Sequence, residues 1–255
     1  MKPKNFPILE YDATREAIIE PGKLIKTMDI AEHCVICFFQ DVIDDLVESD
    51  RAKQVAASKS EMGEHPIYEL EMDGQRLAFF HPGIGGPLAA GMLEESIARG
   101  NRKFIVCGGA GVLNSDIAVG HVVVPLSALR DDGTSYHYLP PAREVHALPE
   151  AVTAIERTLE RHKIPYVVGK TWTTDAFYRE TPQKVQLRRD EGCLTVEMEA
   201  AAFFAVARFR QVILGQILYG GDDLGGAEWD FRDWNHHSSV RETLFWLAAE
   251  ACLML

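Results

Sequence analysis

Apolar and polar positions along the chain follow two patterns. Short apolar runs rich in β-branched and aromatic residues predict buried strands, and longer segments with apolar residues at helical spacing lie between them. We expect strands at 33–39, 67–72, 76–80, 103–107, 122–125, 166–171, 193–196 and 212–219. We expect helices at 41–47, 87–99, 150–162, 182–191, 198–206 and 235–253. Because strands and helices alternate, the sequence predicts an α/β protein with a largely parallel or mixed central sheet.

Turn signals punctuate this pattern. Asp73-Gly74 lies between two strand segments and is a strong hairpin signal, while Gly100 is placed to end the helix before it. Residues 1–30 contain several prolines and predict an irregular lead-in. No repeat, linker or low-complexity tract interrupts the chain, so we expect a single domain over residues 1–255.

Net charge and cysteine content indicate which partners and which cellular compartment to expect. The net charge of −12 over 255 residues argues against nucleic acid or an anionic membrane as the main partner. Five cysteines form no even disulfide framework, which favours a cytoplasmic protein. Cys34 and Cys37 are three apart in a predicted strand, so they point to opposite faces and are expected in the core. The sequence predicts neither a signal peptide nor a membrane span.

The segment 195–204 places two carboxylates, Glu197 and Glu199, around Met198 at a predicted strand-to-helix junction. Acidic residues are favoured in a first helical turn, so the pair could simply cap the helix. The flanks are apolar, however, and a carboxylate buried there without a partner is costly. The alternative hypothesis is therefore a binding site for a polar ligand with hydroxyl groups, and the residues alone leave both open.

Three further segments follow predicted strands: 108–111, 172–179 and 220–223. Binding loops in α/β sheets lie beyond the carboxyl ends of strands, so we expect these segments to gather on one rim with Glu197 and Glu199. The glycines of 83–85 and 109–111 do not complete the G-x-G-x-x-G fingerprint of dinucleotide-binding proteins. They are consistent with tight turns, and equally with a site for an anion or a sugar. The acidic residues of 222–237 fit no zinc or calcium spacing, and we expect no bound metal.

Two features of these segments suggest binding or chemistry. Phe177 and Tyr178 end a strand, where their rings could pack as a lid on the core or stack on a planar ligand. Asp222 follows a strongly apolar strand, where partial burial would raise its pKa and suit a general acid. A turn or capping role for Asp222 is equally consistent with its position.

Five motifs in order resemble those of the purine nucleoside/uridine phosphorylase family, which includes related nucleosidases. The most specific are Val-Glu-Met-Glu-Ala-Ala at 196–201 and Gly-Ile-Gly-Gly-Pro at 83–87. The others lie at 103–111, 132–138 and 174–178, and the resemblance spans about residues 33–253. It implies a three-layer α/β fold with a mixed, partly barrel-like central sheet.

The resemblance also implies residue roles. Glu199, Met198 and Glu197 match the ribose-binding positions, and a carboxylate can accept both hydroxyl protons of the sugar. Phe177 matches the aromatic residue that stacks on the base, with Tyr178 beside it. Asp222 matches the acid that protonates a leaving purine. The phosphate-binding positions correspond to Gly85, Gly108, Gly109 and Ala110.

The chain departs from the family pattern at the phosphate site. Asp44 stands where the Gly-Asp-Pro-x-Arg motif has its arginine, and Val106 replaces the second phosphate arginine. Gly109 replaces a hydroxyl residue. A phosphate dianion thus loses two bidentate partners, for which Arg130, Arg143 or Lys59 could substitute.

The resemblance implies an enzyme that cleaves the N-glycosidic bond of a nucleoside, by phosphorolysis to free base and ribose 1-phosphate, with purines slightly favoured. A phosphate-independent nucleosidase and a catalytically silent nucleoside-binding protein are the alternatives. No cofactor is expected, inorganic phosphate is the expected co-substrate, and a homodimer or homohexamer is the expected assembly.

Overall fold

The computed structural model describes residues 2–255, apart from the side chain of residue 235. Met1, the first residue of the predicted lead-in, lies outside the described residues. The strands are β1 (His33–Cys37), β2 (Lys53–Ser60), β3 (Gly63–Met72), β4 (Gln75–Phe80), β5 (Lys103–Val112), β6 (Val122–Asp131), β7 (Glu144–His146), β8 (Tyr166–Thr174), β9 (Cys193–Glu197) and β10 (Ile213–Asp223).

The α-helices are α1 (Pro21–Leu24), α2 (Gln40–Glu48), α3 (Gly86–Arg99), α4 (Ser135–Tyr138), α5 (Pro149–Arg161), α6 (Pro182–Asp190), α7 (Ala200–Arg210) and α8 (Ser238–Leu253). Short 3-10 helices form at η1 (Pro7–Leu9), η2 (Phe177–Arg179) and η3 (Trp234–His236). Every helix expected from the sequence is present, with bounds that shift by a few residues. The lead-in is mostly irregular, as predicted, and holds η1 and α1.

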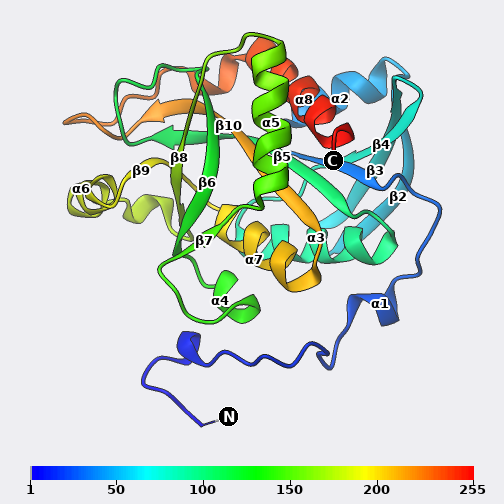
Figure 1. Ribbon diagram of the computed structural model, residues 1–255, viewed down its shortest axis with the longest axis horizontal. Helices are drawn as coiled ribbons and strands as arrows, with labels where there is room; N and C mark the ends of the chain where they lie inside the picture. Colours follow the sequence, from blue (N-terminus) through cyan, green and yellow to red (C-terminus); the bar gives the residue numbers. More distant parts are fainter. Residues whose placement is uncertain (1) are drawn as a thin grey trace.

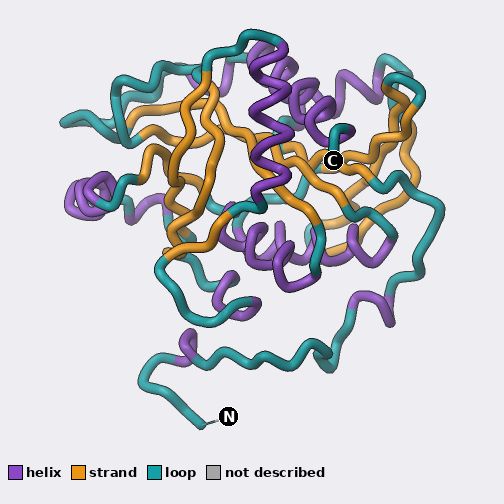
Figure 2. The backbone as a smooth tube through the Cα atoms, viewed as in Figure 1, coloured by secondary structure: helices purple, strands orange, loops and turns teal. Residues whose placement is uncertain are grey.

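The central sheet is mixed and partly closed. Its order is β10-β6-β8-β9-β5-β1-β4-β3-β2, and an additional pairing of β10 with β5 closes the first five strands into a ring. The pairings β1–β5, β5–β10, β6–β8 and β8–β9 are parallel, whereas β5–β9 and β6–β10 are antiparallel. Figure 2 shows the closed part and the flatter extension through β1 to β2. The predicted α/β class with a partly barrel-like sheet is confirmed.

Helices cover the sheet in two groups (Figure 1). The helices α5 and α8 pack together and contact β1, β5 and β10, while α3 and α7 pack together and α7 contacts β6 and β10. Residues 200–207 of α7 are all buried. A helix that is apolar on every side belongs inside a protein, so the start of α7, just after Glu199, is a buried helix N-terminus.

Two glycine-rich segments were predicted wrongly. Residues 108–111 and 220–223 were expected to be loops, but they continue β5 and β10, which pair in the register Tyr219 with Gly109 and Gly220 with Ala110. A Cβ atom on Gly220 would lie 2.9 Å from Val112 Cγ1. These glycines therefore allow close packing around extended strands rather than tight turns.

Two strands were missed. The edge strand β2 has one buried residue, Ser58, and β7 is only three residues long, so neither has a strong apolar pattern. The expected hairpin is present, with Met72 opposite Gln75 and both Asp73 and Gly74 at positive φ. Gly100 ends α3 at a φ of 139°, as its position predicted.

Candidate functional site

The carboxylate of Glu197 organises the junction between β9 and α7. Its side chain accepts hydrogen bonds from the Thr173 hydroxyl at 2.6 Å and from the backbone N–H groups of Glu199 and Ala200 at 2.7 and 2.6 Å. The Thr173 oxygen in turn accepts from the Ala201 N–H at 2.9 Å. Because the first N–H groups of a helix have no partner within the helix, Glu197 and Thr173 together cap α7.

Glu199 is held differently. This residue is only 6% exposed, and its carboxylate accepts a hydrogen bond of 2.6 Å from the backbone N–H of Gly85. Gly85 has a φ of 87°, a conformation that glycine adopts without strain, and this turn aims its N–H at Glu199. The capping interpretation therefore applies to Glu197, while the Glu199 side chain accepts none of the cap hydrogen bonds.

Burial shapes the charge of this pair. It raises the pKa of Glu199 to about 8, and the negative charge of Glu197 adds to the rise. It also raises the pKa of Glu197 to about 7, although the hydrogen bond from Thr173 and the two from backbone N–H groups oppose that rise. The neutral form of each carboxyl group is therefore favoured more strongly than in an exposed glutamate.

A second layer of polar residues surrounds this pair. Asp132 is buried and accepts hydrogen bonds from the Ser135 N–H and hydroxyl at 2.8 and 2.6 Å, and Gly133 donates to Asp175 at 2.7 Å. A Cβ atom on Gly86 would lie 3.1 Å from the Thr134 hydroxyl, so this loop touches the start of α3. The sequence analysis did not single out Thr173, Asp132 or Asp175, although the last two lie within motifs that it used.

The two predicted base-binding aromatics lie on the surface at the end of β8. Phe177 is 49% and Tyr178 is 88% exposed, and their ring centroids are 4.1 Å apart. Thr173 of β8 pairs in register with Glu197 of β9, so the segment that carries both rings leaves the sheet beside the carboxylate pair. They are not core lids in this chain, which leaves their faces available for stacking.

Asp222 lies in β10, and β5 separates it from Val196 of β9. A Cβ atom on Gly111 would lie 3.3 Å from Asp222 Oδ1 and 3.1 Å from Val196 Cγ1, so only glycine lets these two residues approach across β5. The other carboxylate oxygen accepts a hydrogen bond of 2.6 Å from the indole N–H of Trp229. Burial raises the pKa of Asp222, as expected for an acid at this position.

The glycines predicted to hold phosphate have other neighbours. Gly108 and Gly109 lie in β5, where added Cβ atoms would come 3.1 Å from the Phe38 and Tyr219 rings respectively, and Ala110 is buried beside them. The N–H of Gly85 is already donated to Glu199.

The three cations named as substitutes are also engaged elsewhere. Lys59 pairs with Glu64 at 3.0 Å, and Arg143 donates to Glu191 at 2.6 Å. Arg130 is buried and donates to the Ser135 hydroxyl and to two backbone carbonyls.

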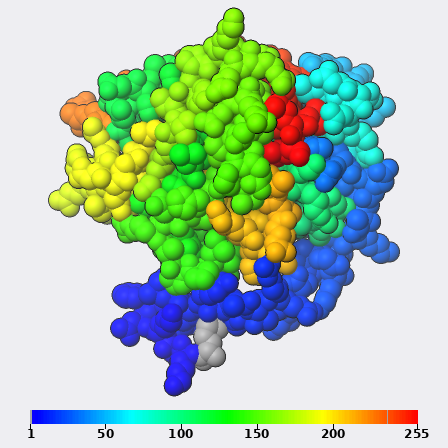
Figure 3. All heavy atoms as spheres, in the orientation of Figure 1, coloured from blue at the N-terminus to red at the C-terminus, as the bar shows by residue number. Residues whose placement is uncertain are grey.

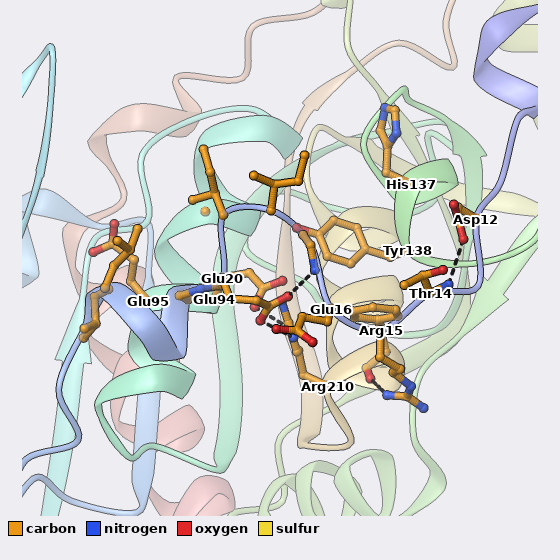
Figure 4. A pocket seen from close by; sticks show the side chains of 18 residues that line it. Asp12, Thr14, Arg15, Glu16, Glu20, Glu94, Glu95, His137, Tyr138 and Arg210 are labelled. Atoms are coloured by element: carbon orange, nitrogen blue, oxygen red, sulfur yellow. Dashed lines mark hydrogen bonds and ion pairs between the residues drawn. The ribbon is translucent and has the colours of Figure 1, made fainter.

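A cavity of about 650 Å³ lies elsewhere, under the N-terminal segment. Figure 3 shows this segment along one side of the molecule, and Figure 4 shows Arg210 pointing towards Glu20 and Glu94 inside the cavity. None of the predicted site residues lines it. Its size therefore does not make it the candidate site, which is defined by the buried carboxylates.

The described residues contain no group of three or more histidine, cysteine, aspartate or glutamate side chains arranged to hold a metal ion. No described helix is long and apolar enough to cross a membrane. All five cysteines are buried and unbridged, in agreement with the expected core positions of Cys34 and Cys37.

The fold and this site define an α/β protein with a partly closed sheet and a buried carboxylate pair at the start of a core helix. Residues 32–246 match the family described as the phosphorylase superfamily, and the chain belongs to that family. The predicted family resemblance is thereby confirmed.

Individual relatives agree with this assignment. Guanosine phosphorylase from Halorubrum lacusprofundi is 33% identical over 203 residues, which cover 78% of this chain and 81% of that protein. A DeoD-type purine nucleoside phosphorylase from Tolumonas auensis is 28% identical over 76% of each chain. Uridine phosphorylase from Vibrio fischeri ES114 has the same fold, with a TM-score of 0.76 and 23% identity over 91% of this chain and 95% of that one.

The raised pKa of Glu199 predicts a pH-dependent stability. Because the folded protein binds this proton more tightly than the unfolded chain, the free energy of unfolding falls as pH rises from about 4.5 to about 8. Glu199→Gln removes that loss, so the variant should be more stable than the parent by about 1–3 kcal/mol at pH 8.5 and equal to it near pH 5.

Urea unfolding at the two pH values measures this difference. The control is Glu71→Gln on β3, whose side chain is exposed and whose effect should be small at both pH values. A stability difference for Glu199→Gln that does not change with pH would contradict the assigned burial of the charge.

Proposed function

We propose that this protein cleaves the N-glycosidic bond of purine nucleosides by phosphorolysis, giving free base and ribose 1-phosphate. The observation that carries the proposal is the buried Glu199 carboxyl, held by Gly85 beside the capped start of α7. Family membership and the 33% identity to a guanosine phosphorylase support the reaction class. The raised pKa of Asp222 favours a purine, whose departure needs a proton.

The proposed roles combine the family resemblance with the geometry of the site. Glu199 accepts hydrogen bonds from the 2′- and 3′-hydroxyls of ribose, with Met198 against the sugar, while Glu197 fixes the start of α7. Because accepting both hydroxyl protons uses the ionised form of Glu199, nucleoside binding favours loss of the proton from this carboxyl. Phe177 and Tyr178 stack on the base.

The chemical step breaks the bond between C1′ and the base nitrogen. The bonding electrons leave with the base, which takes a proton from Asp222, and a phosphate oxygen forms the new bond to C1′. Protonation of a leaving group by a placed acid typically contributes about 10²–10⁴-fold. Asp222 Oδ1, beside Gly111 and Val196, is the oxygen proposed to carry that proton.

We propose Arg241 of α8 as the cation for phosphate. Its guanidinium lies 5.6 Å from the centroid of the Phe39 ring, at the end of β1, and 3.2 Å from Asp41. Phe39 contacts Tyr219, which packs against Gly109. The Nε atom of Arg241 is buried and has no hydrogen-bond partner among the described residues, so one donor of this group is unpaired.

A phosphate-independent nucleosidase is the second candidate, favoured by Asp44 and Val106 at positions where the family pattern has arginines. Asp44 is exposed and accepts a hydrogen bond from Gln40, and Val106 is fully buried in β5. Neither residue can bind a phosphate.

Incubation of the protein with guanosine, inosine, adenosine and uridine, with and without phosphate, separates the candidates. We expect base release that requires phosphate and yields ribose 1-phosphate. Arg241→Gln should raise the KM for phosphate about 10- to 100-fold and change the KM for nucleoside little, since one charge-assisted contact is lost. The control is Arg208→Gln, a partly exposed arginine near the end of α7 that donates to the His146 carbonyl and should leave both KM values unchanged.

Free ribose formed at the same rate without phosphate would overturn phosphorolysis in favour of hydrolysis. The absence of any turnover, with nucleosides still raising the Tm, would favour a silent binding protein. An unchanged phosphate KM in Arg241→Gln would overturn the role of that residue alone.

We further infer that the chain forms a homo-oligomer through its N-terminal segment. Several large apolar side chains of that segment are exposed in the single chain, namely Phe6, Ile18, Ile19 and Leu24. Exposed apolar surface that is concentrated on one segment marks a candidate association site. Light scattering that gives the monomer mass of 28.5 kDa would contradict this inference.

A further inference from the structure

The carboxyl group of Asp222 is held at one of its two oxygens. Oδ2 accepts a hydrogen bond of 2.6 Å from the indole N–H of Trp229. The other oxygen, Oδ1, faces Gly111, where an added Cβ atom would lie 3.3 Å away. The two oxygens therefore have different surroundings: a donor holds Oδ2, while Oδ1 is the oxygen proposed to protonate the leaving base.

This difference decides which oxygen carries the acid proton. An indole N–H donates a hydrogen bond and cannot accept one, so Oδ2 must act as the acceptor. In a protonated carboxyl group the oxygen without the hydrogen is the better acceptor. A protonated Asp222 that is held by Trp229 therefore carries its hydrogen on Oδ1, beside Gly111 and Val196.

Trp229 lies at the end of a hairpin whose base is fixed. The backbones of Asp223 and Asp230 exchange two hydrogen bonds, of 2.8 and 3.0 Å. The guanidinium of Arg232 donates to the buried carboxylate of Asp223. Because Asp223 follows Asp222 and Asp230 follows Trp229, these contacts hold the carboxyl group and the indole opposite each other.

Packing alone does not account for Trp229. The residue is 62% exposed, and its ring meets the Phe231 ring edge-on at a centroid distance of 5.6 Å. A large aromatic side chain that stabilises a fold is normally mostly buried, and its polar atom then takes whatever partner is near. Here little of the ring is buried, so the hydrogen bond to Asp222 is the distinctive interaction of this side chain.

Several groups act on the charge of Asp222. Burial raises the pKa of this carboxyl, and the hydrogen bond from Trp229 opposes that rise. The charge of Asp223 adds to the rise, whereas Arg232 opposes it. Burial also raises the pKa of two further groups, and the charge of Asp222 adds to each rise: Glu180 and Tyr219. Because Trp229 carries no charge, replacing it by phenylalanine removes a donor and leaves every charge in place.

We propose that Trp229 is the positioning residue of the general acid: its indole N–H holds Oδ2 of Asp222 and thereby places the acid proton on Oδ1. This inference rests on the proposed function, because it concerns the proton that Asp222 gives to the base. When that proton leaves, its bonding electrons stay on the carboxylate. A hydrogen bond to a charged acceptor is stronger than one to a neutral acceptor, so Trp229 stabilises the product of the transfer.

Steady-state kinetics of Trp229→Phe with inosine test the proposal. The variant keeps an aromatic ring and loses the donor, so we expect kcat to fall about 10-fold with little change in the KM for inosine. The reaction needs protonated Asp222, so activity is lost as pH rises through the pKa of this group. Without the donor that pKa is higher, and the alkaline loss of activity should move to higher pH.

A second substrate and a second variant serve as controls. The base of N7-methylguanosine already carries a positive charge and leaves without a proton, so its kcat should be the same in the parent and in Trp229→Phe. Phe231→Leu removes the neighbouring ring of the same hairpin but no hydrogen-bond donor. It should leave the pH profile for inosine unchanged. Equal losses for inosine and N7-methylguanosine, or an unmoved pH profile in Trp229→Phe, would overturn the positioning role.

The NMR signal of the Trp229 indole N–H gives a readout that needs no turnover. The signal is assigned by its absence from Trp229→Phe. In the parent it should shift with pH as Asp222 titrates, and in Asp222→Asn this shift should disappear. If no nucleoside is cleaved but the shift is present, the proposed function fails and the pairing of Trp229 with this acid stands. A shift that is the same in Asp222→Asn overturns the pairing.

Discussion

The cap formed by Glu197 is the interaction on which the candidate site depends. One carboxylate satisfies two N–H groups at the buried start of α7 and also accepts a hydrogen bond from Thr173 of the adjacent strand. These hydrogen bonds hold β8, β9 and the start of α7 together, directly beside Glu199. Leaving such buried donors unpaired would cost about 1–3 kcal/mol each. The position of Glu199 is therefore fixed by a structural carboxylate beside it, and the two acids have separate tasks.

The site concentrates acids whose neutral forms are favoured. Burial raises the pKa of Glu197, Glu199 and Asp222 together, in a chain whose net charge is already −12. Such a site suits a neutral ligand rich in hydrogen-bond donors, as a nucleoside is, and opposes a phosphate dianion. A buried guanidinium such as Arg241, beside the end of β1, offsets that opposition within the proposed reaction.

The sequence was sufficient for the junction at Glu197 and Glu199, because its local pattern of extended and helical residues coincides with the observed β9 and α7. It was insufficient for Gly111, since glycine serves turns and close strand packing alike. Only the distant neighbours Leu224 and Val196 decide between them. The local sequence pattern was therefore enough to predict the helices and strands, but the surroundings of the site residues depend on contacts between segments far apart in the sequence.

The central claim is that Glu199 binds the ribose hydroxyls. The most direct test measures by calorimetry how tightly inosine and 2′,3′-dideoxyinosine bind to the parent protein and to Glu199→Gln. The four affinities form a thermodynamic cycle that isolates the interaction between Glu199 and the two hydroxyls. The account predicts that removing both hydroxyls weakens binding to the parent about 10- to 100-fold and changes binding to the variant little, since the charged acceptor is already gone. Equal weakening in both proteins would contradict it.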